Sequence, residues 1–397
     1  MNEETPILIS RAAALETIRT YAEVAPKELV AQFVDAAMTK AKDASENPTK
    51  QARILDILCA LARIADVSTL EKIMGTITSW FDRADAAVLQ KKAYRILEEI
   101  LSRRSETTSK ASFLFGVQIH LRSSPELEVF FSSWASEFEN ALSRPIATIL
   151  PPARAAFCAC VTLTIDSFDD LKRLSEFCLR SLDAIVLSLD KANSTHARSN
   201  ASKCLQHMLI KLIEVGGENG EHPSAVLNDL LARIYEMATP VAGVDNGSVE
   251  MDVARSTFVA LNIVAQKQLK VLNGVHISRL VAHGCAWIGD GRPPVRILVI
   301  RLLRVLAQKL PEFALQQYRD LLLNSIFEEQ LTCDITSKVR KANRLLLEVL
   351  VARFGVDVLL KYTSKPDWVK QMRNIEKINR RKERQINNEA SAKDSDD

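Results

Sequence analysis

The sequence predicts an all-α protein, a HEAT- or armadillo-like α-solenoid built of antiparallel helix pairs. The chain has only 12 Gly and 13 Pro in 397 residues, and Leu and Ala, which are strong helix formers, dominate it. Apolar residues recur at three- and four-residue spacing, and few segments alternate as a strand would. The length exceeds that of one compact domain, so either several domains or a repeat array is expected.

A short motif repeats along the chain and sets the period of the predicted array. Each copy is a basic residue that follows a small or apolar residue and leads into a helical apolar run. The copies centre on Arg53, Lys91, Arg154, Arg198, Arg255, Arg296 and Arg340, of which the one at Lys91 is the loosest. Most intervals are roughly 40 residues, the length of one HEAT or armadillo helix pair. We expect a loop near 104–111 to account for one of the two longer intervals, and a loop near 216–223 or 240–249 to account for the other.

Start and stop residues delimit the expected helices. Pro26, Asn47, Ser68, Asp85 and Thr195 are of types that begin helices. Gly216-Gly217 and Gly355 stand where helices are expected to end. The expected helices cover 9–23, 27–42, 50–65, 69–82, 86–103, 113–121, 127–142, 153–164, 168–190, 196–215, 224–238, 249–267, 275–288, 293–309, 312–328 and 334–354.

The end of the chain differs from the repeats. We expect a HEAT-like array over 1–364, a basic amphipathic helix over 365–388 and an acidic disordered tail over 389–397. Residues 361–384 hold nine Lys/Arg against three Asp/Glu. In a helix, one side would carry Trp368, Met372, Ile375 and Ile386, flanked by Val369 and Ile378. About a third of the circumference would carry Lys370, Arg373, Lys377, Arg380, Arg381 and Arg384.

This cationic side is the strongest candidate for a binding surface. Only Glu376 and Glu383 are interleaved with it, too few to pair with every cation at i,i+4 spacing. A helix face that is simply solvated is the alternative. We expect RNA phosphates or an acidic partner to contact it. The candidate residues are Lys370, Arg373, Lys377, Arg380, Arg381, Lys382 and Arg384, with Lys338, Lys341 and Arg344 as an extension.

Other readings of the basic residues lead elsewhere. Arg380-Arg381-Lys382 is a cluster of the kind found in nuclear-import signals. Membrane binding is not expected, because Asn374, Asn379 and Gln385 interrupt the apolar side of the helix. Arg296 and Arg340 are expected to pair with an acid of a neighbouring repeat.

The sequence gives no indication of catalysis, and we expect no enzyme, no cofactor and no metal. The six histidines lack metal-ligand spacing, and Cys158-Ala159-Cys160 and His283-Gly284-Cys285 are too short and isolated for a zinc site. Cys158 and Cys160 are expected in the core. The seven cysteines lie in apolar helical runs, as reduced intracellular thiols do. The first residues lack the pattern of a secretory signal.

Four blocks of the sequence, in this order, resemble the ribosomal RNA processing protein 12-like family. They are LISRAAALETIRTYAEVAPKELV (8–30), VLQKKAYRILEEILS (88–102), HARSNASKCL (196–205) and RLLLEVLVARFGVDVLLKY…NIEKINRRKER (344–384). The resemblance implies a HEAT-repeat scaffold of the nucleus and nucleolus that binds precursors of the small ribosomal subunit, both RNA and assembly proteins, and supports their processing and export. It also implies contacts with nuclear-transport factors.

The resemblance covers nearly the whole chain but only the C-terminal part of a typical member. The long N-terminal array is absent and the charged tail is reduced to SAKDSDD, so we expect either a natural short form or an incomplete product. Two other functions stay open. One is a karyopherin-like transport adaptor that binds a Ran-type GTPase or nucleoporins, and the other is a generic cytoplasmic HEAT adaptor for proteins. A small-molecule substrate is not expected.

Overall fold

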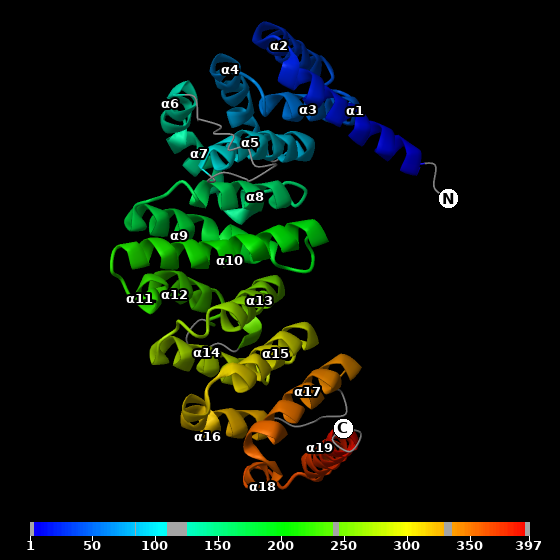
Figure 1. The fold of residues 1–397 in the computed structure, drawn as a ribbon, viewed down its shortest axis with the longest axis vertical. Helices are drawn as coiled ribbons and strands as arrows, with labels where there is room; N and C mark the ends of the chain where they lie inside the picture. Colours follow the sequence, from blue (N-terminus) through cyan, green and yellow to red (C-terminus); the bar gives the residue numbers. More distant parts are fainter. Residues whose placement is uncertain (1–3, 84, 109–124, 241–245, 329–335, 394–397) are drawn as a thin grey trace. The chain divides into compact units, whose positions relative to one another are not determined.

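The computed structural model describes residues 4–83, 85–108, 125–240, 246–328 and 336–393. Every element within these ranges is a helix, so the predicted all-α class is confirmed. The chain divides into two compact units, Met1–Glu221 and His222–Asp397. Within each unit the helices stack in two layers, as they do in helical-repeat proteins (Figure 1).

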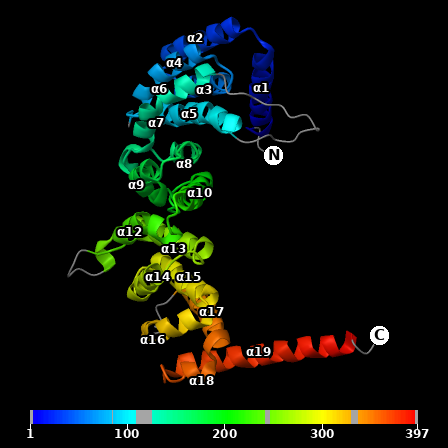
Figure 2. The same cartoon turned by 60° about the vertical axis from the view of Figure 1, so that its left-hand side comes forward.

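The first unit builds one layer from alternate helices. In it α1, α3, α5, α8 and α10 each pack on the next, while α2, α4, α6, α7 and α9 form the second layer (Figures 1 and 2). Short 3-10 turns cover Thr78–Trp80 and Ile146–Thr148. The helices are α1 (Glu4–Val24), α2 (Lys27–Asp43), α3 (Pro48–Ala62), α4 (Val67–Ile77), α5 (Ala87–Thr108), α6 (Pro125–Ser133), α7 (Ala135–Leu142), α8 (Arg154–Ile165), α9 (Leu171–Ser188) and α10 (Thr195–Glu218).

The second unit repeats this plan. Here α13, α15 and α17 pack in one layer and α12, α14 and α16 in the other, and α19 packs on α17 and α18. A 3-10 turn covers Asn246–Ser248. The helices are α11 (Pro223–Val226), α12 (Asn228–Met237), α13 (Met251–Lys267), α14 (Gly274–Trp287), α15 (Pro293–Lys309), α16 (Glu312–Glu328), α17 (Ser337–Phe354), α18 (Val356–Leu359) and α19 (Pro366–Lys393).

The repeated basic motif marks the helices of one layer in each unit. Its seven members lie in α3, α5, α8, α10, α13, α15 and α17, so the period predicted from the sequence is confirmed. The two long intervals contain extra short helices, α6 with α7 and α11 with α12. One expected feature, the helix over 113–121, lies outside the described residues.

Several expected boundaries are wrong, each for a local reason. The helix predicted over 127–142 is divided at Trp134, which has φ −98 and ψ 6, and the helix over 224–238 is divided at Leu227. The stretch at 104–108, expected to be a loop, continues α5. Gly216-Gly217 does not end α10, because Asn219 N–H still bonds to the Val215 carbonyl. The positive φ of 75° falls at Gly220 instead.

Buried polar groups join neighbouring helices of the first unit. The Lys92 ammonium in α5 forms an ion pair with Asp56 of α3, and both side chains are nearly inaccessible. The Gln90 amide, also buried, donates to the carbonyls of Phe81 and Thr148 and accepts from the Leu150 N–H at 2.7 Å. A buried amide with several partners fixes the register of the segments it joins.

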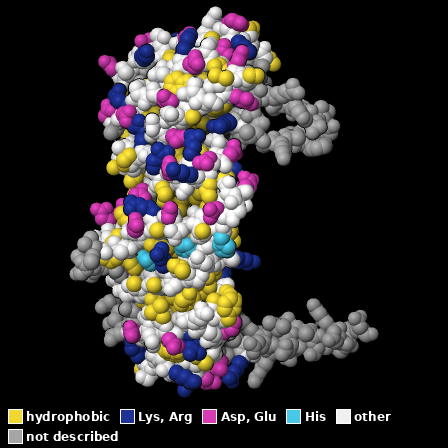
Figure 3. Space-filling view, turned by 90° about the vertical axis from the view of Figure 1, so that its left-hand side faces the viewer, with side chains coloured by type: hydrophobic (Ala, Val, Ile, Leu, Met, Phe, Trp, Pro, Cys, Tyr) yellow, Lys and Arg dark blue, Asp and Glu magenta, His cyan; other side chains and the backbone are white. Residues whose placement is uncertain are grey.

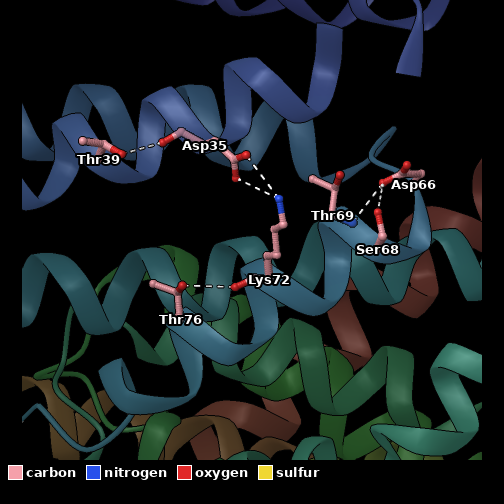
Figure 4. A network of polar contacts seen from close by, with 7 residues as sticks. All are labelled: Asp35, Thr39, Asp66, Ser68, Thr69, Lys72 and Thr76. Carbon is pink, nitrogen blue, oxygen red and sulfur yellow. Dashed lines mark hydrogen bonds and ion pairs between the residues drawn. The ribbon is translucent and has the colours of Figure 1, made fainter. Parts of the chain in front are cut away.

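The second layer of the first unit is joined by more exposed contacts (Figure 4). The Lys72 ammonium of α4 lies 3.2 Å from the Asp35 carboxylate of α2, and both side chains are half exposed. Asp66 caps α4 by accepting from the Thr69 N–H at 2.9 Å. Burial raises the pKa of Asp66, but the hydrogen bonds from Thr69 and Ser68 outweigh it and leave that pKa below its usual range. The surface pair contributes little, and the cap about 1 kcal/mol.

Gly284 allows α14 and α15 to approach closely. A Cβ at this position would lie 3.1 Å from Leu303 Cγ and closer still to its Cδ2, and Leu303 is fully buried. We expect Gly284→Ala to destabilise the protein by about 1–3 kcal/mol through overpacking. Gly75→Ala in α4 is the control, because its Cβ meets nothing within 4 Å; it should stabilise by roughly 0.5–1 kcal/mol. Denaturant unfolding measures both, and equal effects would refute the close-approach argument.

The His207–Asp166 pair predicts a pH dependence of stability. His207 Nε2 lies 2.7 Å from Asp166 Oδ1, and this hydrogen bond raises the pKa of His207 above its ordinary 6.5. Because the folded pKa exceeds the unfolded one, the stabilisation is fully present below pH 6.5 and is lost as pH rises through the folded pKa. His207→Gln should make the thermal-unfolding midpoint less dependent on pH across that window. A midpoint with the same pH profile in both proteins would contradict this assignment.

Candidate nucleic-acid and protein interface at the last helix

Three buried side chains attach α19 to its unit. Trp368, Met372 and Ile375 are 3%, 0% and 4% exposed, as the predicted apolar side requires. The Trp368 ring packs edge-on against Phe327 of α16, with centroids 5.2 Å apart. The Lys365 ammonium donates to the carbonyls of Phe327 and Glu328 at 2.9 Å each. These contacts fix the start of α19, and the later turns of the helix extend beyond the other helices of its unit (Figure 2).

The start of α19 is one residue from the expected one, and the helix continues past residue 388 to Lys393. The backbone is therefore helical through part of the segment expected to be a disordered tail, and 394–397 lie outside the described residues. The side chains of Lys382, Arg384 and Ile386 also lie outside the described part.

The cations on the described turns of α19 are exposed. Lys370, Arg373, Lys377, Arg380 and Arg381 all face solvent. Arg380 pairs with Glu376 at 2.8 Å, four residues earlier in the helix. Among the side chains that the structure describes, no acid pairs with the other four. Exposed cations without acidic neighbours create a positive local potential that attracts anions.

A groove of about 1100 Å³ separates α19 from α17 and divides the predicted stripe. Lys377 and Arg381 line this groove, whereas Lys370, Arg373 and Arg380 are outside its lining. The stripe therefore has a groove edge and an outer edge. The described lining residues are Arg340, Lys341, Arg344, Leu345, Glu348, Asp367, Gln371, Asn374, Ile375, Lys377, Ile378 and Arg381.

Helix α17 supplies the other cationic wall of the groove. Its N-cap, Thr336, accepts from the Val339 N–H, and the next turns place Arg340, Lys341 and Arg344 in the lining. Arg344 pairs with Glu348 at 3.1 Å. Lys341 and Arg344 thus line the groove opposite Lys377 and Arg381, while Lys338 is exposed but does not line the groove.

Arg340 lines the groove, although the sequence predicted a different role for it. It was expected to pair with an acid of a neighbouring repeat, but it is exposed and no acid pairs with it among the described side chains. The expected inter-repeat ion pair is therefore not found at Arg340. Its position, one turn before Arg344 on the same side of the helix, is the sequence feature that could have predicted its place in the groove lining.

The charge balance of the groove is uneven. Five of its described lining residues are Lys or Arg and two, Glu348 and Asp367, are acids. On the face drawn in Figure 3, acidic and basic side chains are intermingled.

Known proteins with a similar sequence include two relatives of the same name. No family model matches the chain. A Homo sapiens protein named RRP12-like protein is 38% identical over 90 residues, which cover 23% of this chain and 7% of that protein. A Gallus gallus protein of the same name is 22% identical over 355 residues, 88% of this chain and 24% of that protein. These matches confirm the resemblance to the ribosomal RNA processing protein 12-like family. The chain spans about a quarter of the length of the second relative.

Solved structures are similar only at the level of helical repeats. Kap121p bound to Nup53p has a TM-score of 0.44 at 17% identity and covers 88% of this chain and 37% of its own. An engineered protein has a TM-score of 0.33 at 14% identity, covering 71% of this chain and 97% of its own. At these scores neither likeness bears on the function of this chain.

The other candidate residues make packing contacts between helices. Cys158 and Cys160 are fully buried, as expected, and burial raises the pKa of the Cys158 thiol to about 12. His283 packs against the ring of Tyr235, with centroids 4.8 Å apart. Within the described ranges, no group of three His, Cys, Asp or Glu could hold a metal. No described helix is long and apolar enough to cross a membrane.

Met372 tests how α19 is held. Met372→Ala leaves a cavity against α17 and α18, and such changes cost about 2–5 kcal/mol in a core. Because α19 is the last element of its unit, we expect faster amide hydrogen exchange in α19 while α13–α16 keep their protection. Met372→Leu conserves volume, costs less than about 1.5 kcal/mol and should leave exchange nearly unchanged. Full protection of α19 in the alanine variant would contradict this anchoring role.

Proposed function

We propose that the chain is a non-catalytic scaffold in the assembly of the small ribosomal subunit, in the nucleus and nucleolus, and that α19 contacts pre-ribosomal RNA. The observation that carries the proposal is the row of exposed cations on the described turns of α19. The matches to RRP12-like proteins support the setting in ribosome assembly.

The spacing of the cations suits a polyanion. Lys370, Arg373, Lys377 and Arg380 recur every three or four residues, so they follow one another at about 5 Å along the helix axis, and Arg381 is next to Arg380. From the first to the last they span roughly 16 Å. Such a row contacts successive phosphates without reading base sequence. The cations of α19 therefore bind pre-rRNA through its phosphates. Specificity for a particular RNA segment comes from other contacts within the pre-ribosomal particle.

The helical-repeat layers take the protein side of the same role. Helices α3, α5 and α8 pack on one another in series within one layer of the first unit, and arrays of this kind serve as extended surfaces for partners in repeat proteins. Processing and export of the pre-ribosome then need no catalytic group from this chain. Contacts with nuclear-transport factors remain an expectation of the family resemblance.

The outer edge of the cationic stripe gives the decisive RNA test. The triple variant Lys370→Gln, Arg373→Gln and Arg380→Gln removes three charges outside the groove and keeps good helix formers. For a single strand, each lost phosphate contact reduces the slope of log K against log salt by about 0.7. We expect a slope lower by about 2 and weaker binding of a mixed-sequence RNA in fluorescence anisotropy.

A matched triple variant in the first unit controls for net charge. Lys40, Lys42 and Lys50 are exposed, and changing all three to Gln alters the net charge by the same amount. This control should keep the parental slope. An unchanged slope in the α19 variant, or an equal loss in both variants, would refute RNA binding by α19. In cells, the α19 variant should also recover less small-subunit pre-rRNA with the tagged chain.

A further inference from the structure

The groove between α17 and α19 combines two chemistries that RNA alone does not use. Leu345, Ile375 and Ile378 contribute apolar groups to its lining, and both helices contribute Lys or Arg side chains. Ile378 is a large apolar side chain that stays 38% exposed. We propose that this groove binds an acidic, amphipathic helix of a partner protein.

The apolar lining separates a protein helix from RNA. Single-stranded RNA gains affinity from phosphate contacts and from bases stacked on aromatic rings. None of the described lining residues is aromatic, so bases would find no stacking platform there. An amphipathic helix instead buries its apolar side in such a groove through residues at i, i+3, i+4 and i+7. Burial of the exposed part of Ile378 adds to its affinity.

The cations of the groove indicate which charge the polar side of the partner helix carries. Arg344 already pairs with Glu348, whereas no acid pairs with Arg340, Lys341, Lys377 or Arg381 among the described side chains. Lys377 and Arg381 are four residues apart, so they lie one helical turn from each other, as Asp or Glu residues at i and i+4 would on the partner. Complementary charge therefore calls for an acidic partner.

The dimensions of the groove agree with a short helical segment. Two turns of helix are about 11 Å long and 10 Å across, which is on the order of 850 Å³. The groove holds about 1100 Å³. Gln371 and Asn374 in the lining can bond to polar groups at the edge of the bound helix.

This surface is distinct from the outer edge that is proposed for RNA. Lys370, Arg373 and Arg380 lie outside the groove lining, so one helix can hold RNA on its outer edge and a protein at its groove edge. The tests of the two proposals therefore use different residues.

The test uses the full chain and two labelled probes. One probe is a short peptide of Leu, Ala, Glu and Asp with the leucines on one helical side and the acids on the other; the second is a mixed-sequence single-stranded RNA. A scrambled peptide of the same composition keeps the charge but loses the apolar side. We expect the amphipathic peptide to bind at least fivefold more tightly than the scrambled one, from burial of one to two leucine side chains.

Variants of the groove separate its two chemistries. Ile378→Gln should weaken peptide binding roughly fivefold and leave RNA binding unchanged. Lys341→Gln, at an exposed position of the opposite wall, should weaken the peptide and reduce its salt dependence. The outer-edge pair Lys370→Gln and Arg373→Gln is the matched control and should leave the peptide affinity unchanged.

Two results would overturn the proposal. One is equal affinity for the amphipathic and scrambled peptides with no effect of Ile378→Gln. The other is loss of RNA affinity on Lys341→Gln together with displacement of the peptide by RNA, which would make the groove a phosphate site. Failure of the outer-edge variants to change RNA binding would count against the proposed function and leave the groove proposal standing.

Discussion

The stacking of each helix on its neighbours in the same layer is the constraint on which the rest of the structure depends. Helix α8 lies between α5 and α10, and its Phe157, Cys160 and Val161 are fully buried. Since a helix enclosed in this way has little free surface, its sequence is apolar on most sides. Gln90 and the Lys92–Asp56 pair are buried with polar partners on neighbouring segments, and they add register to the apolar packing.

Helix α19 obeys the same constraint on one side of its circumference. Trp368, Met372 and Ile375 are buried against the unit, and the remaining sides are free to carry charge. The chemistry of the last helix thus follows from its place in the stack. Burial of the anchors fixes the direction of α19, and that direction determines which cations face α17 and which face solvent.

The sequence predicted the layers well because a buried helix has a strong apolar period. The recurring basic residue identified α3, α5, α8 and α10 in one layer of the first unit and α13, α15 and α17 in one layer of the second. Gly355, with a φ of 76°, ends α17 as expected. Short breaks were missed. Trp134 interrupts 127–142 without a Gly or Pro to mark it, and Gly216-Gly217 continues α10 because packing outweighs the intrinsic cost of glycine in a helix.

The candidate site was predicted only in part, for a geometric reason. The cationic side of α19 follows from its own residues, since Lys370 to Arg381 share one side of a single helix. The groove does not, because it depends on the position of Arg340 and Lys341 in α17 relative to α19. The sequence pattern of neither helix predicts how α17 and α19 are positioned relative to each other. The division of the stripe into two edges, and the exposed Ile378, emerge from tertiary structure alone.

Site-specific photo-crosslinking in assembling particles tests the central claim most directly. A crosslinking amino acid at position 373 reports on the outer edge of α19, and one at position 378 reports on the groove. Our account predicts that position 373 crosslinks to pre-ribosomal RNA and position 378 to a protein segment rich in acidic residues. RNA crosslinks from neither position, or only protein from position 373, would contradict it.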